Sequence, residues 1–302
     1  MTPRIGWTYS LNQAEWLALD PWESFTTLLS WHPDIIRLGV HWSETEVSSG
    51  KYDFSRIERL LKMCTDAKQK VLLTVGMKAP RWPEFYFPEH ITPNPHDPET
   101  QAAALTFLKQ SVRHLQKFDC ISHWQVENEP FDPSGPDNHV IPDDFLCQEC
   151  ELVRTLDSRP IVVNLWGNDV LARGRWPRAN TLADITGLDL YYKQHLFSAL
   201  GKDLYRGPSQ SNTALARAIN QFHKPVWIIE LQAEPWEKDG PSFRQENPPS
   251  MNLAHLEKNL DRALKLPVEC ILLWGAEYWL WKKETSLPQR IAARQQAASA
   301  LH

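Results

Sequence analysis

The sequence predicts an α/β fold, a single (β/α)8 TIM barrel over residues 1–302. Three observations indicate it: eight short apolar runs alternate with helical segments, no glycine-rich phosphate-binding motif follows the first run, and the connecting links are unequal in length. Links from helix to strand are short, whereas several links from strand to helix are long and rich in proline, aromatic and charged residues. In a barrel these long links meet at the C-terminal face, where catalytic residues are found.

The eight apolar runs have the length and the β-branched and aromatic content of buried strands. In chain order they are residues 4–10, 34–42, 70–77, 121–128, 160–167, 187–192, 225–232 and 269–276. The longest links follow the third, fourth, sixth and seventh runs, over residues 78–98, 130–142, 193–211 and 232–251.

Helical periodicity fills the connections between the runs. The predicted helices cover residues 55–69, 99–118, 143–156, 212–223, 252–266 and 288–301. Ser55 and Glu58 have the spacing of a capping box, and Pro288 suits a first helical position. The fifth connection predicts the weakest helix, because Gly174 and Pro177 interrupt it.

Charge and composition favour a neutral partner. There are 32 Lys and Arg residues against 37 Asp and Glu residues, a net charge of -5, with no long block of one sign, so we expect neither a nucleic acid nor a membrane as partner. No apolar stretch approaches the roughly 18 to 20 residues that span a bilayer. Five cysteines are too few for a disulfide framework.

A strand-like run follows Met1 within three residues, and no signal peptide is recognised. The chain as given is therefore expected in the cytoplasm, while secretion of a processed form and the oligomeric state stay open.

Tryptophan is unusually frequent, with 14 residues against 7 tyrosines and 11 phenylalanines. An indole ring fills a core or stacks on the C–H face of a sugar, and composition alone does not separate these uses. The tryptophans that fall at or just after the ends of predicted strands are Trp42, Trp82, Trp166, Trp236 and Trp279.

Two glutamates end otherwise apolar strands. Glu129 follows the fourth run directly, in WQVENEP, and Glu230 lies near the end of the seventh, in VWIIELQ. Because a charge at a barrel mouth is costly without a partner or a task, both need an explanation. Two convergent carboxyl groups about 5 to 5.5 Å apart are the arrangement for double displacement at a glycosidic carbon. The alternative is that each glutamate is a member of an ion pair, for instance with Arg37.

Two segments resemble a known family. WQVENEP resembles the Asn-Glu-Pro signature of the clan A glycoside hydrolases, and IRLGVHWSETEVSSGKYDF resembles a stretch of their cellulase-like and β-galactosidase-like families. The resemblance runs from Ile5 to about Trp281. It implies a barrel whose acid/base ends the fourth strand and whose nucleophile ends the seventh.

Carried over to this sequence, the resemblance implies that Glu129 is the acid/base, Glu230 the nucleophile and Asn128 the ligand of the sugar 2-hydroxyl. Arg37 would lie at the floor of the site and hold Glu230 ionised. Trp274 matches the residue that floors the subsite on the non-reducing side of the cleaved bond.

The family also places a tyrosine beside the nucleophile, and the sixth run offers Tyr191 and Tyr192. Strand alternation directs Asp189 and Tyr191 to the barrel, so we choose Tyr191.

Other acidic, cysteine and histidine residues are weaker candidates for the site. Glu127 has the strand parity of Glu129 but lies one layer deeper, which favours a supporting hydrogen-bonded role. Cys147 and Cys150 lack a second pair to complete a zinc site, so no metal is expected. The family's strand 3 or strand 6 histidine has no clear match among His41, His90, His96 and His195.

We therefore expect a retaining glycoside hydrolase that cleaves a β-glycosidic bond of an oligo- or polysaccharide without a cofactor. Trp42, Trp82 and Trp236 are expected to contribute to substrate binding together with the residues named above. A transglycosylase and a non-catalytic carbohydrate-binding barrel remain alternatives. The sugar, the linkage and the choice between internal and chain-end cleavage stay open.

Overall fold

A computed structural model of the protein describes residues 2–169, 176–238 and 245–300. The eight predicted strands are all present and form a closed parallel barrel in the order β1-β12-β11-β8-β7-β6-β5-β2. This confirms the predicted fold class. The strands are β1 Arg4–Thr8, β2 Ile36–Gly39, β5 Val71–Val75, β6 Ile121–Val126, β7 Ile161–Trp166, β8 Ile185–Leu190, β11 Val226–Gln232 and β12 Cys270–Trp274.

The six predicted helices are also confirmed, with shorter ends in most cases. They are α4 Ser55–Asp66, α5 Pro98–Leu115, α6 Asp143–Leu156, α9 Asn212–Ile219, α10 Leu253–Ala263 and α12 Leu287–Ser299. Additional helices are α1 Leu11–Trp16, α2 Pro21–Leu29, α3 Trp42–Thr45, α8 Trp176–Leu182 and α11 Ala276–Lys282.

The fifth connection contains only the short α8 among its described residues, and Pro177 lies at the second position of that helix. Gly174, and Leu301 at the end of the last predicted helix, lie outside the described residues.

The predicted capping box at α4 is wrong. Ser55 is the first residue of the helix rather than its cap, and its backbone amide donates to Oδ1 of Asp53 at 2.8 Å. A carboxylate two residues upstream therefore satisfies this amide in place of a Ser–Glu exchange. Pro288 lies in the first turn of α12, one residue later than predicted, where its missing N–H costs nothing.

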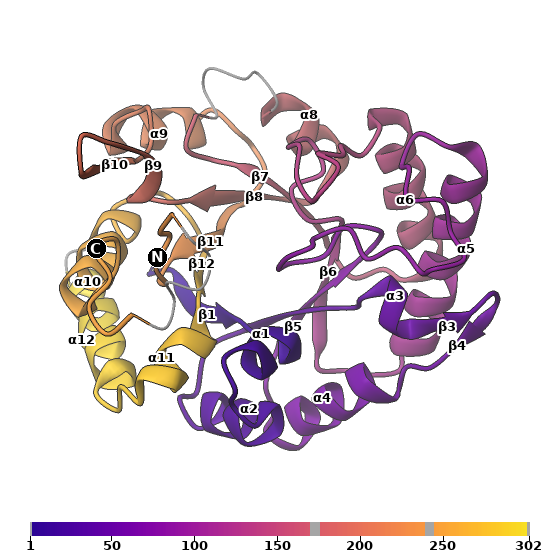
Figure 1. Cartoon of the computed structure of the whole chain (residues 1–302), viewed down its shortest axis with the longest axis horizontal. Coiled ribbons are helices and arrows are strands. Elements are labelled where there is room, and N and C mark those ends of the chain that lie inside the picture. Colours follow the sequence, from indigo (N-terminus) through magenta and orange to yellow (C-terminus); the bar gives the residue numbers. More distant parts are fainter. Residues whose placement is uncertain (1, 170–175, 239–244, 301–302) are drawn as a thin grey trace. The chain divides into compact units, whose positions relative to one another are not determined.

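The chain divides into two compact units. The first comprises residues 1–35, 166–174 and 188–302, and the second comprises residues 36–165 and 175–187. In the second unit β5 lies between β2 and β6, with Arg37 opposite Leu72, and α5 packs beside α6 (Figure 1). In the first unit β12 lies between β1 and β11, and α10 packs against α12 and β11. The prediction of a single domain stays a prediction.

Both units bury polar side chains on their strands as well as aliphatic ones. A buried polar group is costly unless it is hydrogen-bonded, so these residues mark places where the fold serves something other than packing. In the second unit they include Arg37, Thr74, Gln125 and Asn164, and in the first unit they include Asp189, Glu230 and Gln232.

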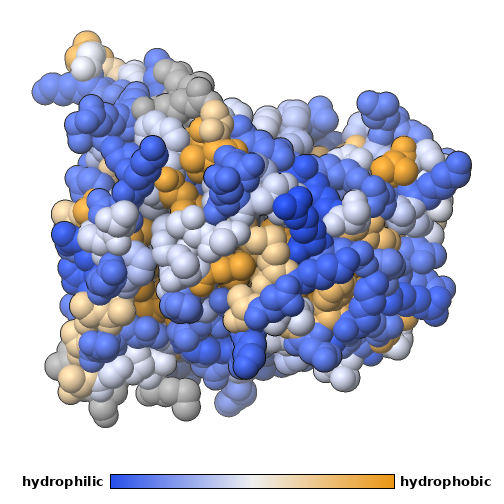
Figure 2. Space-filling view, turned by 90° about the horizontal axis from the view of Figure 1, so that it is seen from below, coloured by the Kyte–Doolittle hydropathy of each residue, from blue (hydrophilic) through white to orange (hydrophobic). Residues whose placement is uncertain are grey.

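The long predicted links follow β5, β6, β8 and β11, as expected. The link after β8 contains an antiparallel hairpin of β9 Gln194–Ala199 and β10 Lys202–Arg206, and a smaller hairpin pairs β3 Glu46–Ser48 with β4 Lys51–Tyr52. The face of the molecule drawn in Figure 2 is mostly hydrophilic, with hydrophobic residues in small groups. Among the described helices none is both long and apolar enough to cross a bilayer.

Candidate active site

Glu129 lies just beyond the end of β6 in the second unit, as the sequence predicted. Its side chain is half-buried, and its backbone adopts a left-handed conformation with φ of 43°. Few residues with a side chain adopt this conformation, so the surrounding contacts must hold it. One such contact is the hydrogen bond that the Glu129 amide donates to Oδ1 of Asn164 on β7, at 2.9 Å.

Arg37 and Asn128 are brought together beside Glu129. Nη2 of Arg37 donates to Oδ1 of Asn128 at 2.5 Å, and Nε donates to Oε1 of Gln125 at 2.7 Å. Nδ2 of Asn164 donates to the same Asn128 oxygen at 3.1 Å. Because the amide oxygen of Asn128 accepts both bonds, the orientation of the amide is fixed and its NH2 group remains a donor for a ligand.

Gln125 and Asn164 support this arrangement, and neither was a predicted site residue. Nε2 of Gln125 donates to Oδ1 of Asn164 at 2.8 Å, and both side chains are fully buried. Each has at least three polar partners, which makes the network well satisfied. A signal exists in the sequence for Asn164, which is an amide within the otherwise apolar β7, but not for Gln125, since β6 also contains Ser122 and His123.

Glu230 lies on β11 in the first unit and is 3% exposed. The hydroxyl of Tyr191 donates to its Oε2 at 2.5 Å. The hydroxyl of Tyr192 instead donates to Oδ1 of Asn212 at 3.3 Å. The structure thus brings Tyr191 and Glu230 together, as strand alternation predicted, and directs the neighbouring tyrosine elsewhere.

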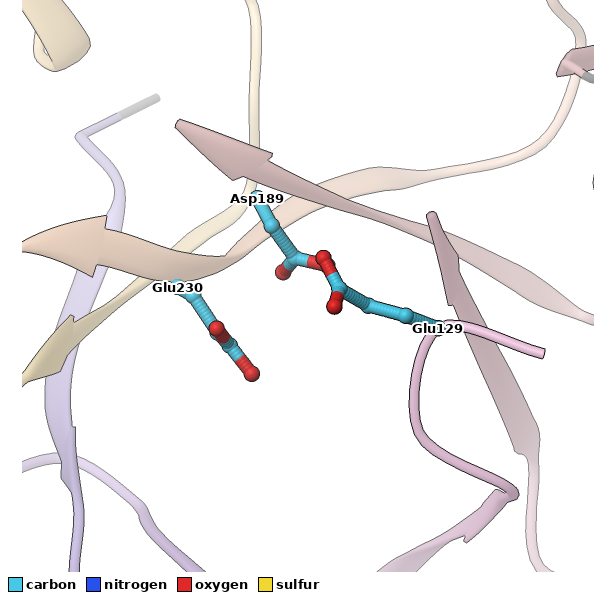
Figure 3. A group of neighbouring side chains, drawn as sticks. All are labelled: Glu129, Asp189 and Glu230. Atoms are coloured by element: carbon cyan, nitrogen blue, oxygen red, sulfur yellow. The ribbon is translucent and has the colours of Figure 1, made fainter. Parts of the chain in front are cut away.

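Asp189 on β8 is a further acidic residue beside Glu230. It is fully buried, and the two side chains carry oxygen atoms within 4.8 Å of each other. Figure 3 draws both, together with Glu129, and shows that Asp189 and Glu230 project from neighbouring strands of the first unit.

An aromatic cluster surrounds Tyr191. Its ring is stacked on Trp166 with centroids 5.3 Å apart, and the edge of Trp236 meets it at 4.8 Å. Trp236 is 41% exposed, so part of this side chain remains accessible although it contacts Tyr191. Trp274 ends β12 and is 9% exposed, and its carbonyl accepts from the amide of Ala233.

The remaining predicted tryptophans differ sharply in exposure. Trp82, in the link after β5, is 69% exposed and presents a free indole face. Trp42 is fully buried, its N–H donates to Oε2 of Glu46 at 2.6 Å, and it stacks on Phe107. Trp42 was expected to contribute to substrate binding, but its burial and its contacts are those of a packing residue.

The histidine candidates have protein partners. His41 stacks on Tyr86 at 3.9 Å, His90 faces Glu46, and His195 contacts Ser198. His96 is exposed. None of these observations ties a histidine to Glu129 or Glu230.

Cys147 and Cys150 both lie on α6, where Cys147 is partly exposed and Cys150 is buried. Burial raises the pKa of the Cys150 thiol to about 12, which disfavours the thiolate that a zinc ion requires.

Comparison with known proteins finds similarity at the level of structure. No family model and no curated protein matches the sequence. A β-galactosidase from Rahnella sp. R3 superposes with a TM-score of 0.66 at 12% identity, over 99% of this chain and 56% of that chain. The exo-β-1,4-mannosidase Op5Man5 from Opitutaceae bacterium strain TAV5 gives 0.66 at 15% identity, over 99% and 60%.

Xylanase 10B from Thermotoga maritima superposes with a TM-score of 0.66 at 12% identity, over 100% of this chain and 97% of that chain. This chain thus spans nearly the whole xylanase but less than two thirds of the β-galactosidase and of the mannosidase. These structural neighbours are glycoside hydrolases by name, and this chain shares their barrel fold.

Proposed function

We propose that the protein is a retaining glycoside hydrolase that cleaves a β-glycosidic bond in an oligo- or polysaccharide. Glu129 is the acid/base and Glu230 is the nucleophile. The observation that carries the proposal is that Glu230, at the end of a barrel strand, receives the Tyr191 hydroxyl on one carboxylate oxygen. A carboxylate oriented in this way by a neighbouring donor is suited to attack on a carbon atom.

In the first step Glu129 donates its proton to the leaving glycosidic oxygen while Glu230 attacks the anomeric carbon. The glycosyl group is then bonded to the Glu230 carboxylate, and Glu129 is ionised. In the second step Glu129 removes a proton from water, which attacks the same carbon and releases Glu230. This reaction requires the two carboxyl groups to face each other about 5 to 5.5 Å apart.

The network of the second unit supports binding of the sugar. The amide oxygen of Asn128 is occupied by Arg37 and Asn164, so its NH2 group is the part that faces a ligand. An amide donor suits the 2-hydroxyl of a sugar, where hydrogen bonds strengthen in the transition state. Arg37 is fully buried and brings a permanent positive charge near the reacting groups.

Exposed tryptophans support a carbohydrate as the ligand. Trp82 and Trp236 are 69% and 41% exposed, although large aromatic side chains gain most from burial. Sugars present flat C–H faces that stack on such rings. Two of the structural neighbours are named as enzymes of β-linked sugars, which favours a β-linked substrate here.

A panel of nitrophenyl β-glycosides tests this proposal, with galactoside, mannoside, xyloside and glucoside as members. We expect release of nitrophenol from at least one glycoside. Glu230→Gln should lower turnover of every substrate by about 10³-fold or more, and Glu129→Gln should do so for substrates with poor leaving groups. Glu151→Gln, an exposed change on α6, is the control. Sugar binding without turnover over the whole panel would instead indicate a non-catalytic carbohydrate-binding barrel.

A further inference from the structure

Two acidic side chains are buried together behind Glu129. Glu127 follows β6, Glu149 lies on α6, and both are 0% exposed. Burying two negative charges side by side carries a desolvation cost and a repulsion that no surface pair experiences. The structure must therefore reduce the charge of this pair or compensate for it.

Hydrogen bonding shows which of the two is charged. Oε1 of Glu127 accepts the amide of Met77 at 2.8 Å, and Oε2 accepts the amide of Lys78 at 2.6 Å. Among the described residues neither oxygen of Glu149 has a hydrogen-bond donor, and its electrostatic partner is Glu127. Two carboxyl groups can hydrogen-bond only if one of them carries a proton. The two amide donors favour Glu127 as the carboxylate of the pair, which leaves Glu149 as the group that would carry the proton.

The titratable neighbours are consistent with this assignment. Burial and the charge of Glu127 raise the pKa of Glu149 well above its usual range. Burial raises the pKa of Glu127 as well, but the interaction with Glu149, the two amides and the Lys78 ammonium all act to lower it. Cys150, on the same helix as Glu149, interacts with the pair as a neutral thiol, because burial raises its pKa to about 12.

Lys78 connects this pair to the acid/base residue. Its amide binds Glu127, and its buried Nζ donates to the carbonyl oxygens of Glu129 at 2.8 Å and of Asp132 at 3.0 Å. The same Nζ lies 3.3 Å from Glu84. Lys78 thereby ties the link after β5 to the turn that carries Glu129.

The backbone of this turn needs such support. Glu127 and Glu129 both have left-handed conformations, with φ of 60° and 43°. Gly76, with φ of 132°, gives the Glu127 carboxylate room, since a Cβ atom there would collide with Oε1. Without its bonds to Met77 and Lys78, the segment from Glu127 to Glu129 would relax toward ordinary backbone angles.

We propose that Glu149 and Glu127 share one buried proton and, through Lys78, act as positioning residues for Glu129. The effect on turnover rests on the proposed function, whereas the shared proton is a property of the folded chain and is tested without substrate. The folded state keeps a proton on Glu149 that the unfolded chain releases. The stabilisation that this proton provides is therefore fully present below the usual glutamate pKa. That stabilisation is lost as pH rises from there through the raised pKa of Glu149.

Urea unfolding at several pH values tests the shared proton. Glu149→Gln keeps a hydrogen-bond donor but cannot ionise, so it serves as the reference. The ratio of the wild-type folding equilibrium constant to that of Glu149→Gln should fall about tenfold per pH unit above about pH 4.3. Glu151→Gln, a change on the exposed face of the same helix, should instead follow the wild type at every pH. Parallel curves for the wild type and Glu149→Gln would overturn the shared proton.

Steady-state kinetics test the positioning role. Glu149→Leu and Lys78→Met should each lower kcat by about 10- to 100-fold with little change in KM, as expected when a reacting group is misplaced. Glu149→Gln should restore most of kcat, because its amide can donate to Glu127. If Glu149→Leu does not fold, the kcat of Lys78→Met is compared with that of Glu149→Gln instead. An unchanged kcat in Lys78→Met, or an equal loss of kcat in Lys78→Met and Glu149→Gln, would overturn the positioning role.

Discussion

The hydroxyl of Tyr191 donates a hydrogen bond of 2.5 Å to Oε2 of Glu230. Tyr191 is held in turn, because its amide donates to Oδ1 of Asn168 and its ring stacks on Trp166. A phenol fixed in this way orients the carboxylate and takes up one of its two oxygens.

Tyr191→Phe removes this donor and keeps the ring. Loss of a hydrogen bond to a charged group costs about 1.5 to 3 kcal/mol, so we expect kcat/KM to fall about 10- to 100-fold. Kinetics with the best nitrophenyl glycoside measure it. Tyr192→Phe is the matched control and should retain wild-type kinetics, since its hydroxyl bonds Asn212. Equal losses in both variants would contradict a specific role for Tyr191.

Azide rescue separates the roles of the two glutamates. With a substrate bearing an activated leaving group, azide should restore turnover of Glu129→Ala and give a β-glycosyl azide, because the nucleophile remains. In Glu230→Ala azide should itself attack and give the α-glycosyl azide. Identification of the azide products measures the outcome. The same anomer from both variants would show that the assigned roles are wrong.

Asn164→Leu tests the network beneath Asn128 and Glu129. The change leaves the Glu129 amide and Nε2 of Gln125 without their acceptor. Each buried donor left unpaired costs about 1 to 3 kcal/mol, so the free energy of unfolding should drop by about 2 kcal/mol or more. Urea unfolding reports this loss. Asn180→Leu, on α8 away from the network, should lose less; a similar loss would argue against the network.

The tryptophans should separate into binding and packing residues. Trp82→Ala should raise KM for oligosaccharides with little effect on stability, because the ring is 69% exposed. Trp274→Ala should weaken sugar binding and turnover in a folded protein. Trp42→Ala should instead lower the free energy of unfolding by about 3 to 5 kcal/mol. A wild-type KM in Trp82→Ala, measured beside its melting curve, would contradict a role of Trp82 in substrate binding.

The barrel could be predicted because its signals are local. Each strand is a short apolar run and each long link is a proline-rich break, so alternation alone gives the order of elements. Strand parity also selected Tyr191 over Tyr192, a choice that the hydrogen bonds agree with. The capping box at α4 was wrong because Asp53, two residues upstream, accepts the Ser55 amide that Glu58 would accept in a capping box.

The supporting residues could not be predicted in the same way. Asn164 and Lys78 matter through partners on other strands and links, so their roles depend on tertiary contacts rather than on spacing. Glu149 reads in the sequence as one of several acidic residues on an amphipathic helix. Its burial against Glu127 becomes visible only when α6 is packed on the barrel. Trp42 and Trp82 look alike in the sequence and differ in exposure for the same reason.

The most direct test of the double-displacement mechanism is the anomeric configuration of the first-formed sugar. Proton NMR during hydrolysis of the best nitrophenyl β-glycoside measures it before mutarotation. Attack by Glu230 followed by attack of water on the same carbon predicts the β anomer first. Initial appearance of the α anomer would contradict the account, because inversion requires a water molecule between carboxyl groups about 6.5 to 9.5 Å apart.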